Sequence, residues 1–371
     1  MARVIQSIEA FDIKLPLPRP LQLGAIHITH RLYTMVKLVD SDGLVGTSVG
    51  LSRNAPIAQT VHQSIAPVIQ MTDVDDYEQT YSTATKSNVC LGTNGIFWRA
   101  LSLVDCAFHD LQARHLQEPL YKFLGGVDNP TLCILVGGYP STEETPETLK
   151  DEILRMASCQ PAGIKIGSSG CLEQDTKRLE IARSVLPLSI PLMIDLYWQF
   201  ASSDALIPYA QRWKEFGMGW VEDPFEFDDW QSASALAKSV AYPVAIGDEQ
   251  CGTRSLLRLM DEGKIKILRL DATVCGGISQ FRFLAGEAMK RNIVVSCHVF
   301  PELHSQISAV TPNSNYVETF LPGSGIDSLD LVNTTPVRIK NGHISPHSFP
   351  GNGYTWDEAA LAKYRTDKAI C

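Results

Sequence analysis

Hydrophobic and polar residues follow two different rhythms along the chain, and the change comes near residue 125. Before it, the pattern predicts a strand over 4–17 and a hairpin over 32–49 that turns at Ser41-Asp42-Gly43. Strands followed by helices are typical of a separate α+β unit, so we expect an N-terminal α+β domain over residues 1–125. The predicted helical stretches of this unit are 56–70, 75–85 and 94–115.

Beyond this unit, short apolar runs alternate with amphipathic stretches of helical length. In one such stretch, apolar residues from Leu206 to Trp213 have helical spacing, and Gly217 is placed to end the helix. Eight strands with intervening helices are typical of a (β/α)8 barrel, which we predict over 126–325; a doubly wound open sheet is the alternative. The predicted strands are 132–136, 163–166, 192–194, 220–221, 244–246, 267–270, 293–296 and 316–317.

Polar or ionisable residues stand at the end of every predicted barrel strand from the second onward. Because the C-terminal ends of barrel strands converge on one mouth, where this fold performs its chemistry, we expect these side chains to lie together. Each residue alone also has a structural explanation, such as a helix cap or a core histidine. The set is Lys165, Asp195, Glu222, Asp248, Asp271, His298 and Glu318.

Three consecutive members of this set are carboxylates, namely Asp195, Glu222 and Asp248. Converging oxygen ligands suit Mg²⁺ rather than Zn²⁺, which would draw histidine or cysteine. A lysine precedes the three acids and an Asp–His pair follows them, and both are groups that transfer protons. The set therefore suits abstraction of the proton α to a carboxylate, with the metal stabilising the resulting enediolate.

Composition narrows the class of protein. A net charge of −9 leaves no basic surplus for phosphates, so we expect no nucleic-acid partner. The nine cysteines form no C-x-x-C pair, which is typical of reduced thiols in a cytoplasmic protein. No apolar run approaches a membrane span of about 18 residues, and the first residues lack the apolar stretch of a signal peptide. We expect a cytoplasmic protein without a membrane partner.

Short motifs recur in a fixed order along the barrel region. They are Gly-Ile-Lys-Ile-Gly at 163–167, Met-Ile-Asp at 193–195, Trp-Val-Glu-Asp-Pro at 220–224, Ile-Gly-Asp-Glu at 246–249, Leu-Asp-Ala at 270–272, Cys-Gly-Gly at 275–277, Ser-Cys-His-Val-Phe-Pro-Glu at 296–302 and Tyr-Val-Glu at 316–318. This series resembles the mandelate racemase branch of the enolase superfamily, within the mandelate racemase / muconate lactonizing enzyme family. The resemblance implies a capping domain, a modified TIM barrel, a lid loop near 18–31 and a C-terminal segment, 326–371, that packs back on the cap.

The resemblance also implies a role for each strand-end residue. Asp195, Glu222 and Asp248 would be the Mg²⁺ ligands, with Glu249 as the second choice for the third; Lys165, His298 and its partner Asp271 would transfer protons; and Glu318 would hydrogen-bond the substrate carboxylate. The sequence departs from the family at Gly163, where the first lysine of a Lys-x-Lys motif is missing, and at Tyr197, where the family often has Asn.

Four further residues are candidates for substrate binding: Tyr139, Tyr197, His27 and His30. The two histidines fall in the expected lid loop, where solvent-exposed loop histidines are an equally good explanation. Tyr139 follows the first barrel strand, and a packing role there is as well supported as contact with substrate.

The candidate site defines a first step but leaves the product open. Loss of a β-hydroxyl would make the protein an acid-sugar dehydratase, a lyase that gives a 2-keto-3-deoxy acid, and this is the favoured interpretation. Proton exchange between Lys165 and His298 would instead give a racemase or epimerase, and loss of an ether oxygen a cycloisomerase. A non-catalytic barrel is poorly supported because the residue set is complete. We expect a small carboxylic acid substrate and a homo-oligomer.

Overall fold

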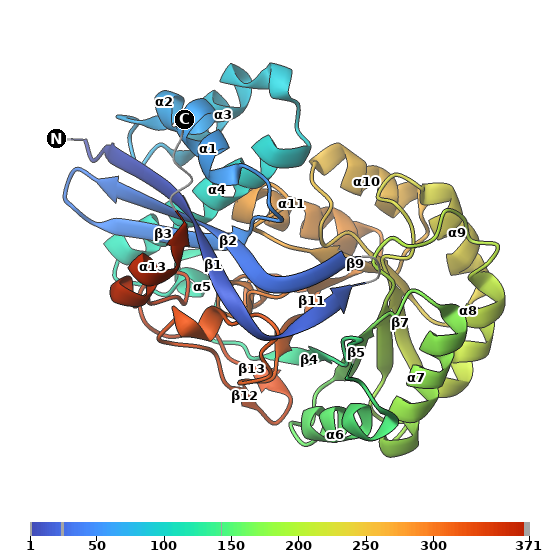
Figure 1. Ribbon diagram of the computed structural model, residues 1–371. Coiled ribbons are helices and arrows are strands. Elements are labelled where there is room, and N and C mark those ends of the chain that lie inside the picture. The colour runs from blue at the N-terminus through green and yellow to red at the C-terminus, as the bar shows by residue number, and fades with distance from the viewer. Residues whose placement is uncertain (1, 24–25, 142, 367–371) are drawn as a thin grey trace.

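The computed structural model describes residues 2–23, 26–141 and 143–366, which form two sheets surrounded by helices (Figure 1). Strands β4 to β11 run parallel in chain order, and β11 pairs with β4, so that eight strands close into a barrel. The predicted barrel and all eight of its strands are confirmed. Their bounds are β4 Thr131–Gly137, β5 Gly163–Gly167, β6 Leu192–Asp195, β7 Met218–Glu222, β8 Val244–Ile246, β9 Ile267–Leu270, β10 Val294–Cys297 and β11 Ser314–Phe320.

Helices surround the barrel strands and bury their apolar faces against them. In α8, the apolar spacing seen in the sequence buries Ala210 and Trp213 completely. The helix ends through a short 3-10 turn at Gly217, whose φ of +62° lies in the left-handed region that favours glycine. The helices are α6 Pro146–Ala157, α7 Leu172–Val185, α8 Ile207–Trp213, α9 Trp230–Ser239, α10 Thr253–Glu262, α11 Gly277–Lys290 and α12 Pro301–Ser308.

The N-terminal residues form an antiparallel sheet, the cap sheet, with the strand order β14-β1-β2-β3. Helix α4 packs between this sheet and barrel helix α11. The contact is close because β3 carries glycine: a Cβ at Gly46 would come 2.3 Å from the Ala107 carbonyl oxygen of α4. The elements are β1 Ile5–Leu23, β2 Ile26–Asp40, β3 Val45–Leu51, α1 Ile57–Thr60, a π-helical turn Val61–Ile65, α2 Ala66–Ile69, α3 Tyr77–Ser87, α4 Gly95–His115 and α5 Leu120–Phe123.

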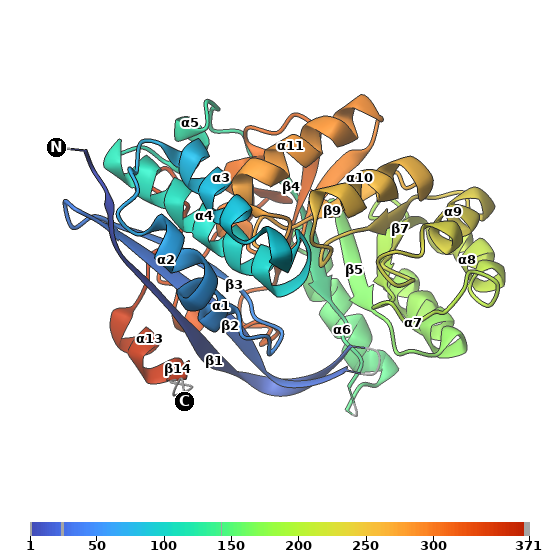
Figure 2. The ribbon, with the colours of Figure 1, turned by 90° about the horizontal axis from the view of Figure 1, so that it is seen from above.

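The lid loop expected near 18–31 is wrong in one respect, because most of these residues extend strands β1 and β2. The two strands form a long hairpin that arches across the barrel (Figure 2). Prolines in 16–20 argue against a strand, since proline cannot donate a ladder hydrogen bond. They are tolerated because, in the described part of the chain, no strand pairs with residues 16–20 on the side of β1 away from β2. The register also shifts between Pro16 and Leu21.

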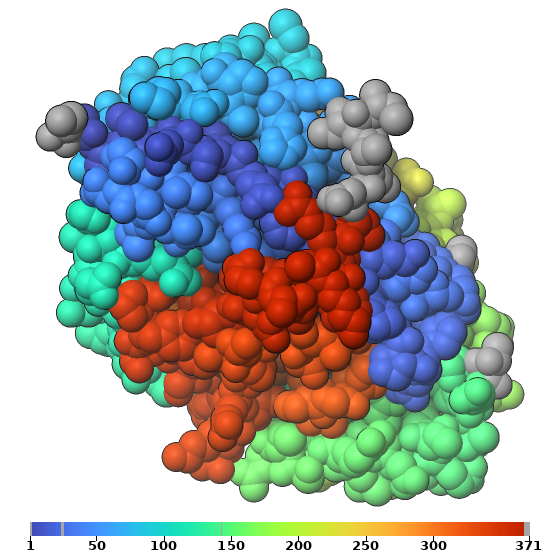
Figure 3. Space-filling view, turned by 60° about the vertical axis from the view of Figure 1, so that its left-hand side comes forward, coloured from blue at the N-terminus to red at the C-terminus, as the bar shows by residue number. Residues whose placement is uncertain are grey.

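The C-terminal residues contact both sheets. Strand β13 pairs with barrel strand β4, whereas β14 pairs with β1 of the cap sheet. In Figure 3 this segment, in red, lies against the blue N-terminal strands on one side and the orange part of the barrel on the other. The elements are β12 Ile339–Lys340, β13 His343–Ile344, α13 Glu358–Tyr364 and β14 Arg365–Thr366. None of the helices described is long and apolar enough to cross a membrane.

Candidate active site

A cavity of about 450 Å³ lies between the barrel mouth and the β1–β2 hairpin. It is lined by most of the predicted site residues and by all four candidates for substrate binding: Lys165, Asp195, Asp248, Glu249, His298, Glu318, Tyr139, Tyr197, His27 and His30. The other two predicted residues, Glu222 and Asp271, are fully buried beside this set and contact its members. The strand ends thus bring the predicted set together at one mouth.

Lys165 lies at the centre of the three acidic strand ends. Its ammonium is 2.6 Å from Glu318 Oε1 and 3.3 Å from Asp195 Oδ2, and it also contacts Glu222 Oε1. Burial alone lowers the pKa of Lys165, but these carboxylates outweigh burial and raise the pKa well above its usual value. A lysine base must lose this proton, which requires a second cation to take over part of the carboxylate charge.

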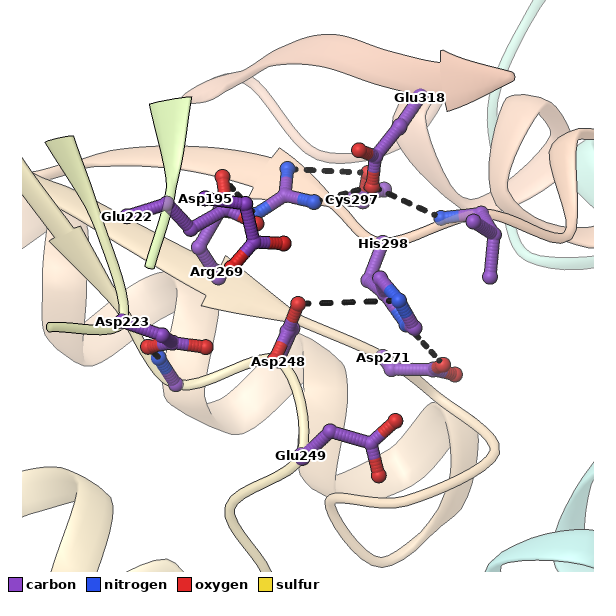
Figure 4. A network of polar contacts seen from close by, with 12 residues as sticks. Asp195, Glu222, Asp223, Asp248, Glu249, Arg269, Asp271, Cys297, His298 and Glu318 are labelled. Carbon is purple, nitrogen blue, oxygen red and sulfur yellow. Dashed lines mark hydrogen bonds and ion pairs between the residues drawn. The ribbon is translucent and has the colours of Figure 1, made fainter. Parts of the chain in front are cut away.

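Arg269 completes a ring of alternating charges inside the barrel. Its guanidinium contacts Glu318 Oε2 and is 3.3 Å from Glu222 Oε2, whereas Lys165 contacts the Oε1 atom of each acid. Trp220 Nε1 also donates to Glu222 Oε2 at 2.7 Å. Each glutamate therefore has one oxygen held from inside the barrel and one facing the lysine. Figure 4 shows the guanidinium reaching toward Glu318.

Arg269 also supplies a positive charge that position 163 cannot. A Cβ at Gly163 would come 2.4 Å from Met193 Cε, so the lysine of the family motif would fit there only if the Met193 side chain moved. Arg269 is fully buried and donates to Ser296 Oγ at 2.6 Å, which fixes its position between the two acids. Arg269 was not among the residues predicted from the sequence, although it stands two residues before Asp271, and side chains two residues apart on an extended chain point to the same side.

We expect Arg269→Met to destabilise the fold by about 3 kcal/mol or more, because it leaves Glu222 and Glu318 with one buried cation between them. Urea denaturation at neutral pH measures the change. The matched control is Arg258→Met, whose exposed ion pair with Glu262 predicts a loss of about 1 kcal/mol or less. Equal losses of unfolding free energy in the two variants would contradict the role of Arg269 in holding the two buried acids.

The Asp–His pair has the geometry of a positioned general acid or base. His298 Nδ1 is 3.0 Å from Asp271 Oδ2, and Asp271 Oδ1 accepts from the Thr273 amide and hydroxyl, each at 2.7 Å. His298 Nε2 faces the cavity, 3.7 Å from Asp248 Oδ2 (Figure 4). Burial lowers the pKa of His298, but Asp248 and Asp271 outweigh it and raise the pKa to about 9.

Asp248 and Glu249 are neighbours with different surroundings. Oδ1 of Asp248 is buried and has no hydrogen-bond partner among the residues described. Glu249 instead accepts from Arg53 Nε at 3.0 Å and from Arg99 Nη2 at 2.5 Å, and both arginines come from the cap. Burial raises the pKa of Glu249, but the two arginines outweigh it and hold the pKa far below its usual range. Glu249 therefore joins cap to barrel, whereas Asp248 pairs with His298 through Oδ2 and keeps Oδ1 available.

The residues present fit a divalent cation with oxygen ligands. Asp195, Glu222 and Asp248 end successive strands, and Asp248 offers an unpartnered buried oxygen. Burial and the neighbouring acids raise the pKa of Asp195 to about 8 although Lys165 opposes this, so the cluster holds more negative charge than its own cations offset. As placed, no three His, Cys, Asp or Glu side chains among the described residues already surround one point, because Lys165 lies between Asp195 and Glu222.

Backbone strain gathers where the chain leaves two of these strands. Tyr197 and Trp198, after Asp195, have φ values of +49° and +56°, and Val299 and Phe300, after His298, have +36° and +45°. Such left-handed conformations cost about 1–3 kcal/mol each in residues other than glycine and cluster at functional sites. All four side chains line the cavity, so the strained turns direct mainly aromatic groups toward it.

Comparisons with known proteins agree with this architecture. Residues 7–125 match the family model for the mandelate racemase / muconate lactonizing enzyme N-terminal domain, and residues 149–360 match the enolase C-terminal domain-like model. The chain therefore belongs to the mandelate racemase / muconate lactonizing enzyme family of the enolase superfamily, as its motifs indicated. The lyase and isomerase classes expected of it are the classes of its relatives.

Among its relatives, arabinonate dehydratase of Saccharolobus solfataricus is 26% identical over 88% of each chain. The L-talarate/galactarate dehydratase of Salmonella typhimurium is 24% identical over 90% of this chain and 82% of its own. A 3,6-anhydro-alpha-L-galactonate cycloisomerase of Streptomyces coelicolor is 25% identical over 88% of this chain and 90% of its own. A variant of an L-talarate/galactarate dehydratase, solved with Mg and L-glucarate, has the same fold, with a TM-score of 0.90. It is 22% identical, and the match covers 99% of this chain and 93% of that chain.

Proposed function

We propose that this protein is a Mg²⁺-dependent acid-sugar dehydratase. Asp195, Glu222 and Asp248 would hold the metal, which when bound stabilises negative charge on the substrate carboxylate as the α-proton leaves. The observation that supports this best is the pair of proton-transfer groups on opposite sides of one acidic cluster: Lys165 on β5 and His298 after β10. Dehydratases are also the commonest activity among the relatives named above.

The protein's own groups divide the reaction between two faces of the substrate. Lys165, which contacts Asp195, Glu222 and Glu318, would remove the α-proton from one face once its own proton is lost. His298, whose raised pKa keeps it protonated at neutral pH, would donate a proton to the departing β-hydroxyl. Glu318, held by Lys165 and Arg269, has its pKa lowered to about 2 despite burial, so it would accept a hydrogen bond from a substrate hydroxyl rather than donate one to the substrate carboxylate, as the resemblance implied.

The test is a screen of mono- and dicarboxylic sugar acids for keto-acid formation with Mg²⁺. We expect at least one acid to give a 2-keto-3-deoxy product, and its α-proton to exchange with D₂O. A cycloisomerase, the activity of one relative, would release no keto acid, and a racemase would change only the configuration. No turnover and no α-proton exchange with any acid would contradict the proposed function. Cytoplasmic location and a homo-oligomeric state stay predictions.

The metal assignment predicts different effects for two adjacent acids. We expect Asp248→Asn to weaken Mg²⁺ binding more than about 100-fold. Residues that only hydrogen-bond a metal ligand usually cost less affinity than this when they are replaced. Glu249→Gln should weaken it less than about tenfold, because Arg53 and Arg99 already neutralise this acid. Titration calorimetry measures both affinities. A larger loss in Glu249→Gln than in Asp248→Asn would reverse the assignment.

A further inference from the structure

We propose that Arg31 binds a second carboxylate, at the end of the substrate remote from the metal, and that the substrates are therefore dicarboxylic sugar acids. The inference rests on the proposed function, because it places the first carboxylate of the substrate at Asp195, Glu222 and Asp248. It concerns a residue of the cap sheet, outside the set of strand-end residues described above.

Arg31 faces the cavity from the hairpin that covers it. It lies on β2, is 5% exposed and lines the cavity. Its Nε donates to the backbone carbonyl of Ile326 at 2.9 Å, the one hydrogen bond that the Arg31 side chain makes among the residues described. The two terminal amino groups of the guanidinium are thus left for a group inside the cavity. These groups form a planar fork that matches the two oxygens of a carboxylate.

The charges around the cavity distinguish Arg31 from the other arginines that line it. Arg53 and Arg99 share Glu249, so each already has a carboxylate partner. Arg31 has no carboxylate within ion-pair distance in the described part of the chain. The nearby Asp327 accepts from the Leu329 amide at 3.2 Å instead. The charge of Asp327 acts on Arg31 without forming an ion pair, so the buried guanidinium lacks a directly bound anion, and a carboxylate of the substrate would supply one.

The position of Arg31 fits the far end of a substrate. Ile326 follows β11, the eighth barrel strand, whereas the three metal-binding acids end β6, β7 and β8, the third to fifth strands. In an eight-stranded barrel the eighth strand lies opposite the fourth, so Arg31 and the acids lie on opposite sides of the mouth. Lys165 and Glu318, which line the cavity, lie between them. One carboxylate would thus bind at each side, with the reacting carbon near the lysine.

The experiment compares pairs of acids that differ only at the remote carbon: galactarate with galactonate, and glucarate with gluconate. Turnover and calorimetric binding are measured with Mg²⁺ on the full chain, its Arg31→Met and Arg31→Lys variants, and the control Arg19→Met. Arg19 lies on the same hairpin but pairs with Glu152, outside the cavity lining. Thermal unfolding shows whether each variant is folded.

We expect the unaltered protein to prefer a dicarboxylic acid over its monocarboxylic partner by at least about tenfold. Arg31→Met should remove that preference, with a loss of about 10- to 100-fold for the dicarboxylic acid, as for a hydrogen bond to a charged group. The loss for the monocarboxylic acid should be less than about threefold. Arg31→Lys, which keeps the charge without the fork, should restore part of the preference, and Arg19→Met should change nothing.

Three results would overturn the assignment: a preference for monocarboxylic acids in the unaltered protein, equal losses for both acids in folded Arg31→Met, or binding of neither acid of either pair. Failure of the proposed function looks different. In that case no acid is turned over or exchanges its α-proton, whereas the calorimetric preference for dicarboxylic acids, and its loss in Arg31→Met, can still be measured.

Discussion

Lys165→Met should reduce turnover of the identified acid by about 10³-fold or more, toward the upper end of what general acid–base catalysis supplies. The lysine is the group that contacts all three of Asp195, Glu222 and Glu318, so its loss removes both the proton acceptor and a buried cation. Steady-state kinetics at saturating Mg²⁺ measure the effect. Mg²⁺ affinity should not fall, because the variant loses a positive charge that competes for the same carboxylates.

Lys122→Met is the control for this prediction, since Lys122 is largely exposed and pairs with Glu118 on the surface. Exchange of the substrate α-proton with D₂O identifies the base directly. If Lys165 is the base, exchange stops in Lys165→Met and survives in His298→Asn. If exchange continues in Lys165→Met and stops in His298→Asn, the roles of the two groups are reversed.

Asp271→Asn should lower turnover by about 100-fold or more, within the range of general acid–base catalysis, while His298→Asn should abolish dehydration. Asp271 holds one tautomer of His298 through the Nδ1 contact of 3.0 Å and contributes to the raised pKa. A general acid works in its protonated form, so activity falls as pH rises through the pKa of the histidine. Removing the carboxylate lowers that pKa, and the alkaline limb of the kcat/KM profile should move to lower pH.

This shift separates a functional pair from a structural one. If Asp271 only supported the fold, Asp271→Asn would lower thermal stability and leave the alkaline limb unmoved. His304→Gln is a useful comparison, because His304 is also buried near Asp271. Its ring donates to the Val299 carbonyl oxygen and accepts from the Ala272 amide, so its hydrogen bonds go to the backbone. We expect this variant to lose stability without a change in the pH profile. Full turnover in both Asp271→Asn and His298→Asn would contradict the mechanism.

The barrel could be predicted from the sequence because its strands are buried apolar runs that end at ionisable residues. The runs 244–246 and 267–270 are strands β8 and β9 with the same bounds, and the other six differ by a residue or more at an end. The hairpin over the mouth could not be predicted, because prolines in 16–20 indicate a loop unless the free edge of β1 is known. The local pattern of apolar residues thus predicts strands well where the whole strand is buried.

The candidate site could be predicted where a residue's position on a strand decides its direction. Strand ends identified Lys165 and His298, which the structure places at one cavity. The family resemblance ranked Asp248 before Glu249, but the sequence could not show that Glu249 pairs with Arg53 and Arg99, about 150 to 200 residues away along the chain. Pairing across such separations leaves no local pattern. The same holds for Arg31, whose partner Ile326 is 295 residues distant.

The C-terminal segment has a consequence for how the protein is made. Strand β14, at Arg365–Thr366, completes the cap sheet by pairing with Asp12 and Ile13 near the other end of the chain. Asn352 donates to the Thr47 carbonyl oxygen at 2.7 Å and fixes the same closure from β3. During synthesis β1 leaves the ribosome before the barrel does, yet its neighbour β14 follows the barrel in the chain. The cap must therefore wait, incompletely paired, through translation of the entire barrel.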